Sequence, residues 1–476
     1  MTALEAIRQA EDRLTARFAD KLVVNHDLNR TLVSFQANKR QNGYRWFKYK
    51  EGFSASLVGY LLERLGVAGG RLIDPFAGSG AALFGAAEAG LDSLGIELLP
   101  VGREIIEARK LAPDPSDLAP SLEQWEREKP WRAARQVAPF GHLRITEGAF
   151  PPETEESIGK YVASLEGVEP RARSLLRFAA MCVLEEVSYT RKDGQYLRWD
   201  YRSGRRQGAK RFDKGPIPGF DEAVTAKLRQ IREDIGGRPK GLFAGLERGT
   251  VEVVTGSCLD VLPRTEAAAF DCLITSPPYC NRYDYTRTYA LELAFLGTPE
   301  NELRELRQAM VSCTVENRDK EGLWRRFEGE LFQRAKEAFE GQELLIQLLA
   351  YLEQRRAAGL LNNAGIPRMV RNYFREMALV IFECARVLKP GAPLVMVNDN
   401  VRYDGAGVPV DLILSEFARR AGFEVETIWV LPIGKGNSSQ QMGRHGRDEL
   451  RKCVYVWRAP KAPQARKPNP PLAARR

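Results

Sequence analysis

Short apolar runs alternate with longer amphipathic stretches along much of the chain. The runs typical of buried strands are residues 71–74, 94–97, 270–274 and 393–397. Stretches with helical spacing separate them, so the pattern predicts an α/β fold with a doubly wound, mainly parallel sheet. Two later runs, 425–433 and 453–458, have only a polar loop between them. They predict an antiparallel hairpin at the edge of the sheet.

Two long segments interrupt this alternation. One separates the run 94–97 from a third strand expected at the start of the segment 250–297. The other follows the run 270–274 and its Pro-Pro motif, and has a largely helical pattern. The predicted division is an N-terminal helical segment (1–30), an α/β domain in three parts (31–99, 250–297 and 368–459), two helical or irregular insertions (100–249 and 298–367) and a proline-rich tail (460–476). We expect the tail to be disordered.

The first apolar run leads into a glycine-rich turn, Asp74-Pro75-Phe76-Ala77-Gly78-Ser79-Gly80. Glycine lets the backbone approach a ligand closely, and the helix expected after the turn offers free N–H groups. Glu97 ends the next run, 17 residues beyond Gly80, a spacing that suits a carboxylate accepting both hydroxyls of a ribose. The turn lacks the third glycine of dinucleotide sites and the lysine of a P-loop. It therefore favours S-adenosylmethionine, which has no phosphates.

A second motif, Thr275-Ser276-Pro277-Pro278-Tyr279, follows the run 270–274. The two prolines fix the backbone and supply no N–H, so the turn can direct carbonyl oxygens outward. Ser276 and the Pro277 carbonyl can accept hydrogen bonds from an exocyclic amine while Tyr279 stacks on the ring, which predicts a nucleobase pocket. Ser-Pro-Pro is also an ordinary way to end a strand and begin a loop.

Together the two motifs resemble those of the S-adenosylmethionine-dependent DNA amino-methyltransferases, which methylate cytosine N4 or adenine N6. The resemblance extends to residues 46–62, 254–262 and 385–397. It implies a Rossmann-like class I methyltransferase fold and S-adenosylmethionine as the cofactor. The positions that it assigns to the cofactor are Asp74, Phe76, Gly78, Gly80, Glu97, Ser257, Cys258, Phe53 and Ser54. Those that it assigns to the reacting amine are Ser276, Pro277, Pro278 and Tyr279.

The first residue of the Pro-Pro motif bears on the base. In the family that this chain resembles, Ser at that place accompanies mostly cytosine-N4 enzymes, and Asp or Asn mostly adenine-N6 enzymes. Ser276 therefore favours a site-specific DNA methyltransferase that acts on N4 of a flipped cytosine, with adenine N6 as the alternative. Direct in-line transfer suffices for an amine. The Pro-Cys pair of carbon-5 cytosine enzymes is absent from the sequence.

A basic and aromatic segment, residues 189–214, lies in the first insertion. It holds nine Lys or Arg residues and three Asp residues, interleaved with five aromatic residues. Basic side chains can neutralise phosphates while Arg and aromatic groups reach the bases. The candidates for DNA contact are Arg198, Arg202, Arg205, Arg206, Lys210 and Arg211. The alternative is a merely solvated loop.

The segment that recognises the DNA sequence can lie in either insertion. In the family, recognition domains often sit immediately before the Pro-Pro motif, but here the third strand nearly adjoins that motif. We favour the first insertion because it carries the basic and aromatic segment. The loop 434–451, rich in Gly, Ser, Gln and Arg, is a further candidate for DNA contact or simply a mobile loop.

The composition excludes several other classes of protein. Seven scattered cysteines without a Cys-x-x-Cys pair, and only three histidines, argue against disulfides, a zinc site and metal catalysis. Neither a signal sequence nor a membrane span is evident, so we expect a cytoplasmic protein. The net charge of +9 suits a polyanionic partner, above all double-stranded DNA. A companion restriction endonuclease is a candidate partner, and the competing functions are RNA methylation and DNA binding without catalysis.

Overall fold

The computed structural model describes residues 2–112, 118–194, 196–208, 211–235, 247–320, 322–323, 329–432 and 450–461. Lys210, the residues 434–449 of the glycine- and serine-rich loop, and the tail residues 462–476 lie outside the described residues. The predictions made for these three parts of the chain therefore stay predictions.

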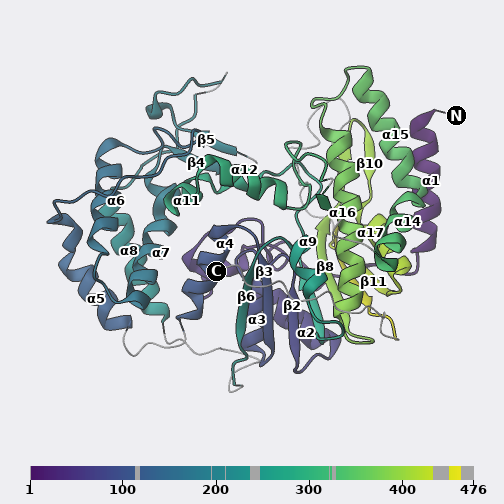
Figure 1. Ribbon diagram of the computed structural model, residues 1–476, viewed down its shortest axis with the longest axis horizontal. Helices are drawn as coiled ribbons and strands as arrows, with labels where there is room; N and C mark the ends of the chain where they lie inside the picture. The colour runs from purple at the N-terminus through teal and green to yellow at the C-terminus, as the bar shows by residue number, and fades with distance from the viewer. Residues whose placement is uncertain are drawn as a thin grey trace.

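The described residues form a central sheet of eight strands in the order β1-β11-β12-β8-β7-β2-β3-β6 (Figure 1). Their bounds are β1 (Leu22–Val24), β2 (Arg71–Asp74), β3 (Asp92–Glu97), β6 (Val251–Thr255), β7 (Cys272–Thr275), β8 (Pro393–Asp399), β11 (Glu424–Val430) and β12 (Lys452–Arg458). Only β12 runs antiparallel to its neighbours β8 and β11. This arrangement confirms the predicted Rossmann-like methyltransferase fold with a mainly parallel sheet.

The edge of the sheet differs in one respect from the expectation. The strands β11 and β12 form the predicted antiparallel pair, but β1 from the N-terminal segment adds a further parallel strand to β11. This three-residue strand is only partly buried and has no long apolar run in the sequence. Periodicity alone could not predict it.

Helices cover both faces of the sheet because alternate residues of each strand point to opposite sides. Leu72 and Ile274 pack with α2 and α3, whereas Ile73 and Leu273 pack with α16 and α17. The helices concerned are α2 (Ala55–Leu65), α3 (Ala81–Glu88), α9 (Cys258–Val261), α16 (Ile366–Val387) and α17 (Val410–Ala421). Their packing directs the ends of β2, β3 and β7 toward a common edge of the sheet.

The first insertion forms a helical lobe at the left of Figure 1 with its own apolar core. Its elements are α4 (Pro100–Lys110), α5 (Leu118–Glu128), α6 (Pro152–Ser164), α7 (Pro170–Val187), the hairpin β4 (Thr190–Asp193) and β5 (Tyr196–Trp199), and α8 (Phe220–Asp234). Helix α11 (Ala290–Phe295) also contributes to this core through Leu291 and Leu293. The lobe is thus attached directly to the chain that follows the Pro-Pro motif.

The second insertion does not form a separate core. Its helices α14 (Glu330–Glu340) and α15 (Glu343–Ala357) pack beside α16, α17 and the N-terminal helix α1 (Ala3–Arg17). The remaining elements are α10 (Tyr285–Thr288), α12 (Glu300–Ala309), β9 (Val401–Tyr403), β10 (Ala406–Val408) and the short 3₁₀ helices at Ala37–Arg40, Tyr44–Trp46, Pro130–Arg132, Tyr201–Ser203 and Leu262–Arg264. No helix within the described ranges has the length and apolar character needed to cross a membrane.

Candidate active site

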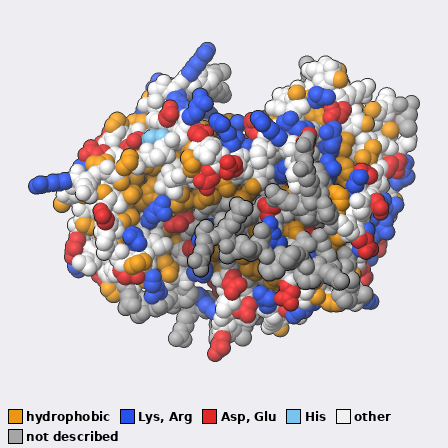
Figure 2. All heavy atoms as spheres, viewed as in Figure 1, with side chains coloured by type: hydrophobic (Ala, Val, Ile, Leu, Met, Phe, Trp, Pro, Cys, Tyr) orange, Lys and Arg blue, Asp and Glu red, His pale blue; other side chains and the backbone are white. Residues whose placement is uncertain are grey.

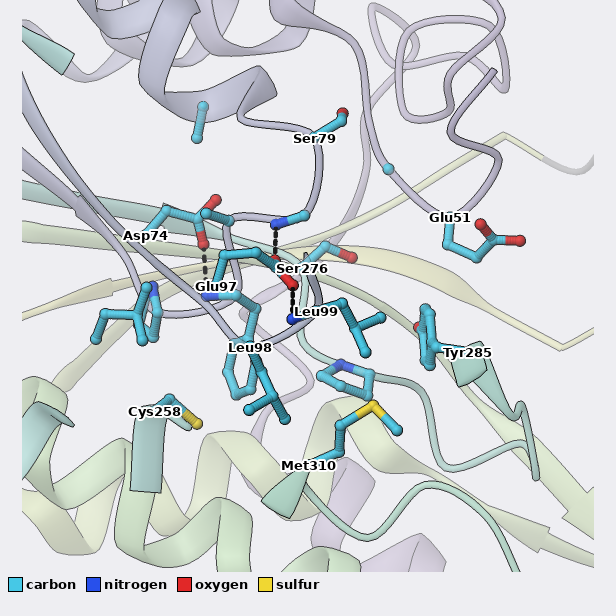
Figure 3. Close-up of a pocket in the computed structure, with 18 of the residues that line it drawn as sticks. Glu51, Asp74, Ser79, Glu97, Leu98, Leu99, Cys258, Ser276, Tyr285 and Met310 are labelled. Carbon is cyan, nitrogen blue, oxygen red and sulfur yellow. Dashed lines mark hydrogen bonds between the residues drawn. The ribbon is translucent and has the colours of Figure 1, made fainter. Parts of the chain in front are cut away.

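Two adjoining pockets lie where the parallel strands end. The first, here called the glycine-turn pocket, holds about 760 Å³ of empty space including open solvent, and it lies against the turn that follows β2 (Figure 3). The second, here called the Tyr279 pocket, is about 1610 Å³ including open solvent. Both are lined by Glu51, Gly52 and Tyr285, so a group bound in one pocket can reach a group bound in the other.

The glycine turn brings the backbone close to the first pocket. Gly78 and Gly80 have φ values of 54° and 76°, a region that favours glycine. A Cβ on Gly78 would lie 3.1 Å from the Tyr49 ring, and one on Gly80 would lie 2.9 Å from Ile106. Gly80 starts helix α3 and is behind the pocket wall, whereas Gly78, Ser79 and Phe76 line the pocket.

Glu97 is the buried acid at the end of β3. One carboxylate oxygen accepts a hydrogen bond from the Gly78 N–H at 2.6 Å, and the other accepts one from the Leu99 N–H at 2.7 Å, as Figure 3 shows. Burial raises the pKa of this carboxyl to about 8, although the N–H groups oppose the rise. Each oxygen retains a lone pair, so the carboxylate can also accept from a pair of hydroxyls.

Asp74 at the end of β2 is held in a similar way. It accepts hydrogen bonds from the Phe76 N–H at 3.0 Å and from the Thr275 hydroxyl at 2.5 Å. Burial raises the pKa of Asp74 to about 7, and these two donors oppose the rise. A ligand that donates hydrogen bonds or carries positive charge would favour the ionised forms of both acids.

The remaining positions assigned to the cofactor divide into two groups. Phe53, Ser257 and Cys258 line the glycine-turn pocket. Burial raises the pKa of the Cys258 thiol, which therefore stays neutral and offers an apolar contact near pH 7. Ser54 does not line the pocket. Its hydroxyl donates to the Leu32 carbonyl, and Ser54 is the N-cap residue of helix α2. Ser54, like Gly80, thus shapes the wall from behind.

The Pro-Pro motif lies at the junction of the two pockets. Ser276 and Pro278 line the glycine-turn pocket, Tyr279 lines the other, and Pro277 lines neither. The Ser276 hydroxyl donates to the Val397 carbonyl at 3.1 Å and lies 3.4 Å from the Tyr279 hydroxyl. Because its proton is directed to a carbonyl, the Ser276 oxygen can act as an acceptor for another donor.

Several wall residues were not predicted from the sequence. Glu51 accepts short hydrogen bonds from the hydroxyls of Tyr283 and Tyr289, and the Tyr289 ring stacks on Tyr49 at a centroid distance of 5.1 Å. Tyr283 and Tyr285 directly follow the Pro-Pro motif, where a polar-aromatic run is the available signal. Nothing in the sequence around Glu51 singles it out, since its role depends on tyrosines more than two hundred residues away.

The basic segment of the first insertion lies beside the Tyr279 pocket. Gly194, at the turn of the β4–β5 hairpin, lines this pocket, and Lys192 of β4 forms a buried ion pair with Glu292 of α11 at 2.6 Å. Figure 2 shows Lys and Arg side chains gathered in the upper middle of this face, near β4, β5 and α12. The hairpin is therefore fixed close to the site.

The predicted DNA-contact residues differ in their surroundings. Arg202 forms a two-point ion pair with buried Asp200, at 2.7 and 3.0 Å. Three other guanidinium groups lie over aromatic rings: Arg198 over Phe212, Arg205 over Trp199 and Arg211 over Tyr201. The distances from the guanidinium carbon to the ring centre are 4.2, 3.7 and 3.6 Å. Arg206 is exposed. Much of the interleaving of basic and aromatic residues thus serves packing within the loop.

Within the ranges that the structure describes, no cluster of His, Cys, Asp or Glu side chains could hold a metal ion.

No protein-family model matches the sequence. The chain is 51% identical over 462 residues to the type II methyltransferase M.AvaI of Nostoc sp., covering 96% of this chain and 95% of that protein. It is 40% identical over 459 residues to the type II methyltransferase M.BsoBI of Geobacillus stearothermophilus, covering 91% and 88%. The chain belongs to the type II DNA methyltransferase family.

In this methyltransferase the two motifs lie on neighbouring strands. β2 delivers the glycine turn and β7 delivers the Pro-Pro motif, and the two strands are paired in parallel. The hydrogen bond from Thr275 to Asp74 joins the motifs directly.

Proposed function

We propose that the protein transfers the methyl group of S-adenosylmethionine to N4 of a cytosine that is flipped out of double-stranded DNA. The observation that carries this proposal is the position of Ser276 and Pro278 between two pockets, with Tyr279 facing the second. The glycine-turn pocket takes the cofactor, and the Tyr279 pocket takes the base.

The glycine-turn pocket fits S-adenosylmethionine in several respects. It is lined by apolar groups such as Phe53 and Met310 together with a few polar groups such as Glu97 and Ser257, as is usual for small-molecule sites. Glu97 would accept hydrogen bonds from the ribose hydroxyls, and Cys258 and Phe53 would contact apolar parts of the ligand. Gly78, which has no Cβ, would let the ligand lie close to the backbone of the turn. When bound, S-adenosylmethionine supplies an electrophilic methyl group.

The residues of the Pro-Pro motif would prepare the amine for transfer. The exocyclic lone pair is delocalised into the ring, so the nitrogen is a poor nucleophile in plane. A hydrogen bond from the amine to the Ser276 hydroxyl favours a pyramidal nitrogen, and stacking on Tyr279 holds the ring in place. Pro277, which lines neither pocket, would fix the turn and not accept from the amine. Positioning and fixed dipoles supply most of the acceleration.

Cytosine N4 is proposed in preference to adenine N6 on account of Ser276. A serine oxygen whose own proton is directed to the Val397 carbonyl at 3.1 Å is a neutral acceptor for an amine N–H. The chemistry itself serves both bases, and adenine N6 is the alternative that an experiment must separate. We further propose that the first insertion contacts the DNA, since the β4–β5 hairpin adjoins the Tyr279 pocket.

The test is the DNA of bacterial cells that express the protein. We expect nucleoside mass spectrometry to detect N4-methylcytosine, and strand-resolved sequencing to find it at one short recognition sequence. The matched control is the same host that expresses Ser276→Ala. In vitro, duplex DNA and structured RNA compete for labelled methyl groups, and transfer to RNA alone would refute the proposal.

A further inference from the structure

A lysine and an aspartate face each other in the wall of the Tyr279 pocket. Lys452 of β12 is in register with Asp399 of β8, and both line the pocket. The Lys452 ammonium lies 3.3 Å from Asp399 Oδ1, and its side chain is 19% exposed. A lysine is rarely this buried without a partner or a function.

The ammonium also lies beside the proposed stacking residue. Lys452 Nζ is 5.9 Å from the centre of the Tyr279 ring. Burial raises the pKa of the Tyr279 hydroxyl, and the ammonium opposes that rise. The same hydroxyl is 3.4 Å from Ser276 Oγ. A charged donor thus lies in the same wall as the residues that are proposed to hold the base.

Lys452 remains charged in this position. Burial by itself lowers the pKa of the ammonium, but the neighbouring Tyr279 and Asp399 outweigh it, and the net pKa is raised. An ammonium has three N–H donors. Asp399 and the Tyr279 hydroxyl occupy two of these directions, which leaves one N–H for a ligand in the pocket.

The two candidate bases differ in what they offer to such a donor. Beside its amine, cytosine carries two acceptors, the ring nitrogen N3 and the carbonyl O2. Adenine carries the acceptor N1 and then a C–H group, where cytosine has its carbonyl. A donor that reaches the carbonyl position therefore stabilises cytosine in the pocket, and an enzyme that provides it loses that stabilisation with adenine.

We propose that Lys452, oriented by Asp399, donates a hydrogen bond to the O2 carbonyl of the flipped base and so contributes to the selection of cytosine. This inference rests on the proposed function. Arg30 and Lys50 line the same pocket, and contact between Lys452 and a DNA phosphate is the competing role that the test must distinguish.

The first experiment compares Lys452→Met with Lys389→Met. Lys389 forms a similar ion pair with Asp271 at 2.7 Å, but it lies before β8, at the end of the sheet away from the pockets. Using the recognition duplex and labelled S-adenosylmethionine, we expect K452M to lower kcat/KM by about 10- to 100-fold and K389M to leave it unchanged. Cofactor affinity, measured by calorimetry, should be the same in both variants.

The second experiment tests the base contact itself. The target cytosine is replaced by the C-nucleoside of 2-aminopyridine, a neutral analogue that keeps the amine and the ring nitrogen beside it but has C–H in place of the carbonyl. Wild-type activity should fall by about tenfold or more, whereas K452M should show no further loss. Losses that multiply would overturn the proposal, and so would K452M activity equal to that of the wild type.

Binding to DNA that lacks the target base distinguishes a contact of Lys452 with the base from a contact with a phosphate. On a duplex with an abasic site at the target position, K452M should bind as tightly as the wild type; an equal loss on abasic and intact DNA would assign Lys452 to a phosphate and overturn the proposal. The proposed function fails separately, if the wild type methylates adenine. Wild-type methylation of cytosine with no analogue effect would remove only the Lys452 contact.

Discussion

The two pockets are constructed in different ways. In the glycine-turn pocket, the acids are fixed largely by the backbone: Glu97 accepts from two N–H groups, and Asp74 accepts from one N–H group and from the Thr275 hydroxyl. In the Tyr279 pocket, charged groups are fixed by other side chains, as in the pair of Lys452 with Asp399. Backbone donors depend on the course of the chain, whereas side-chain pairs change with single substitutions.

This difference matches the two ligands that we propose. A cofactor of constant structure is suited by a pocket whose polar groups are held by turns at strand ends. A base that must be distinguished from other bases is suited by side chains with defined donors and acceptors. The comparison predicts that substitutions in the first pocket impair cofactor binding, and that those in the second impair the choice and use of DNA.

The largest effect is expected at the junction of the pockets. Ser276→Ala removes the proposed acceptor for the amine, so kcat should fall by about 100- to 1,000-fold, while cofactor affinity should change little. Single-turnover transfer and calorimetry measure these two quantities. The matched control is Ser93→Ala, which removes a hydroxyl of β3 that donates to the Thr250 carbonyl just before β6 and should retain activity. An equal loss of cofactor affinity in S276A would contradict the prediction that Ser276 acts on the amine and not on the cofactor.

The next effect concerns the backbone-held acid. Glu97→Gln must turn an NH₂ group toward one of two N–H donors, so we expect S-adenosylmethionine to bind about 10- to 100-fold more weakly. The affinity of the enzyme for DNA, measured at a fixed, saturating cofactor concentration, should change less. The control is Glu88→Gln, since Glu88 is a partly buried acid of α3 that contacts the Tyr44 hydroxyl outside the pocket.

The raised pKa of Glu97 gives this prediction a pH dependence. Ribose hydroxyls favour the charged carboxylate, so binding releases a proton below the pKa of about 8. Cofactor affinity should therefore rise with pH up to about 8 and then level off, and the rise should be smaller in E97Q. The folded protein without cofactor retains a proton that the unfolded chain loses above its ordinary pKa of 4.5. Stability should consequently decrease between that value and about 8.

The smallest effects are expected in the basic segment, where two arginines can be compared. Arg206→Ala removes an exposed charge, so it should reduce DNA affinity a few-fold and lower the slope of log affinity against log salt by about 1. Arg202→Ala leaves the buried Asp200 without its two-point partner and should lower the melting temperature instead. Salt-dependent DNA binding and thermal unfolding, measured on both variants, separate these effects. If both variants lost the same DNA affinity and the same stability, Arg206 would not differ from Arg202 in its role.

The extent to which the site could be predicted follows the same division. The turn at Gly78 and the acid Glu97 follow strands whose apolar runs are evident in the sequence, so their meeting at one edge of the sheet could be expected. The ion pair of Lys452 with Asp399 depends on β12 entering the sheet beside β8, and on the register of these strands. Neither follows from local pattern.

The fold shows a similar limit. Its parallel strands and antiparallel pair have clear periodic signals, but β1 is too short and too exposed to have one. The basic segment was predicted from composition, which does not distinguish Arg202, paired with a buried Asp200, from exposed Arg206. Side-chain partners that are distant in sequence are the information that the pattern of the chain lacks.

The most direct measurement of the central claim uses purified protein, duplex DNA that contains the recognition sequence, and S-adenosylmethionine with an isotopically labelled methyl group. The DNA is digested to nucleosides and the labelled product is identified by mass spectrometry. We expect labelled N4-methyl-2′-deoxycytidine, formed by the wild type and nearly lost in S276A. Labelled N6-methyl-2′-deoxyadenosine as the product, or S276A activity equal to that of the wild type, would contradict it.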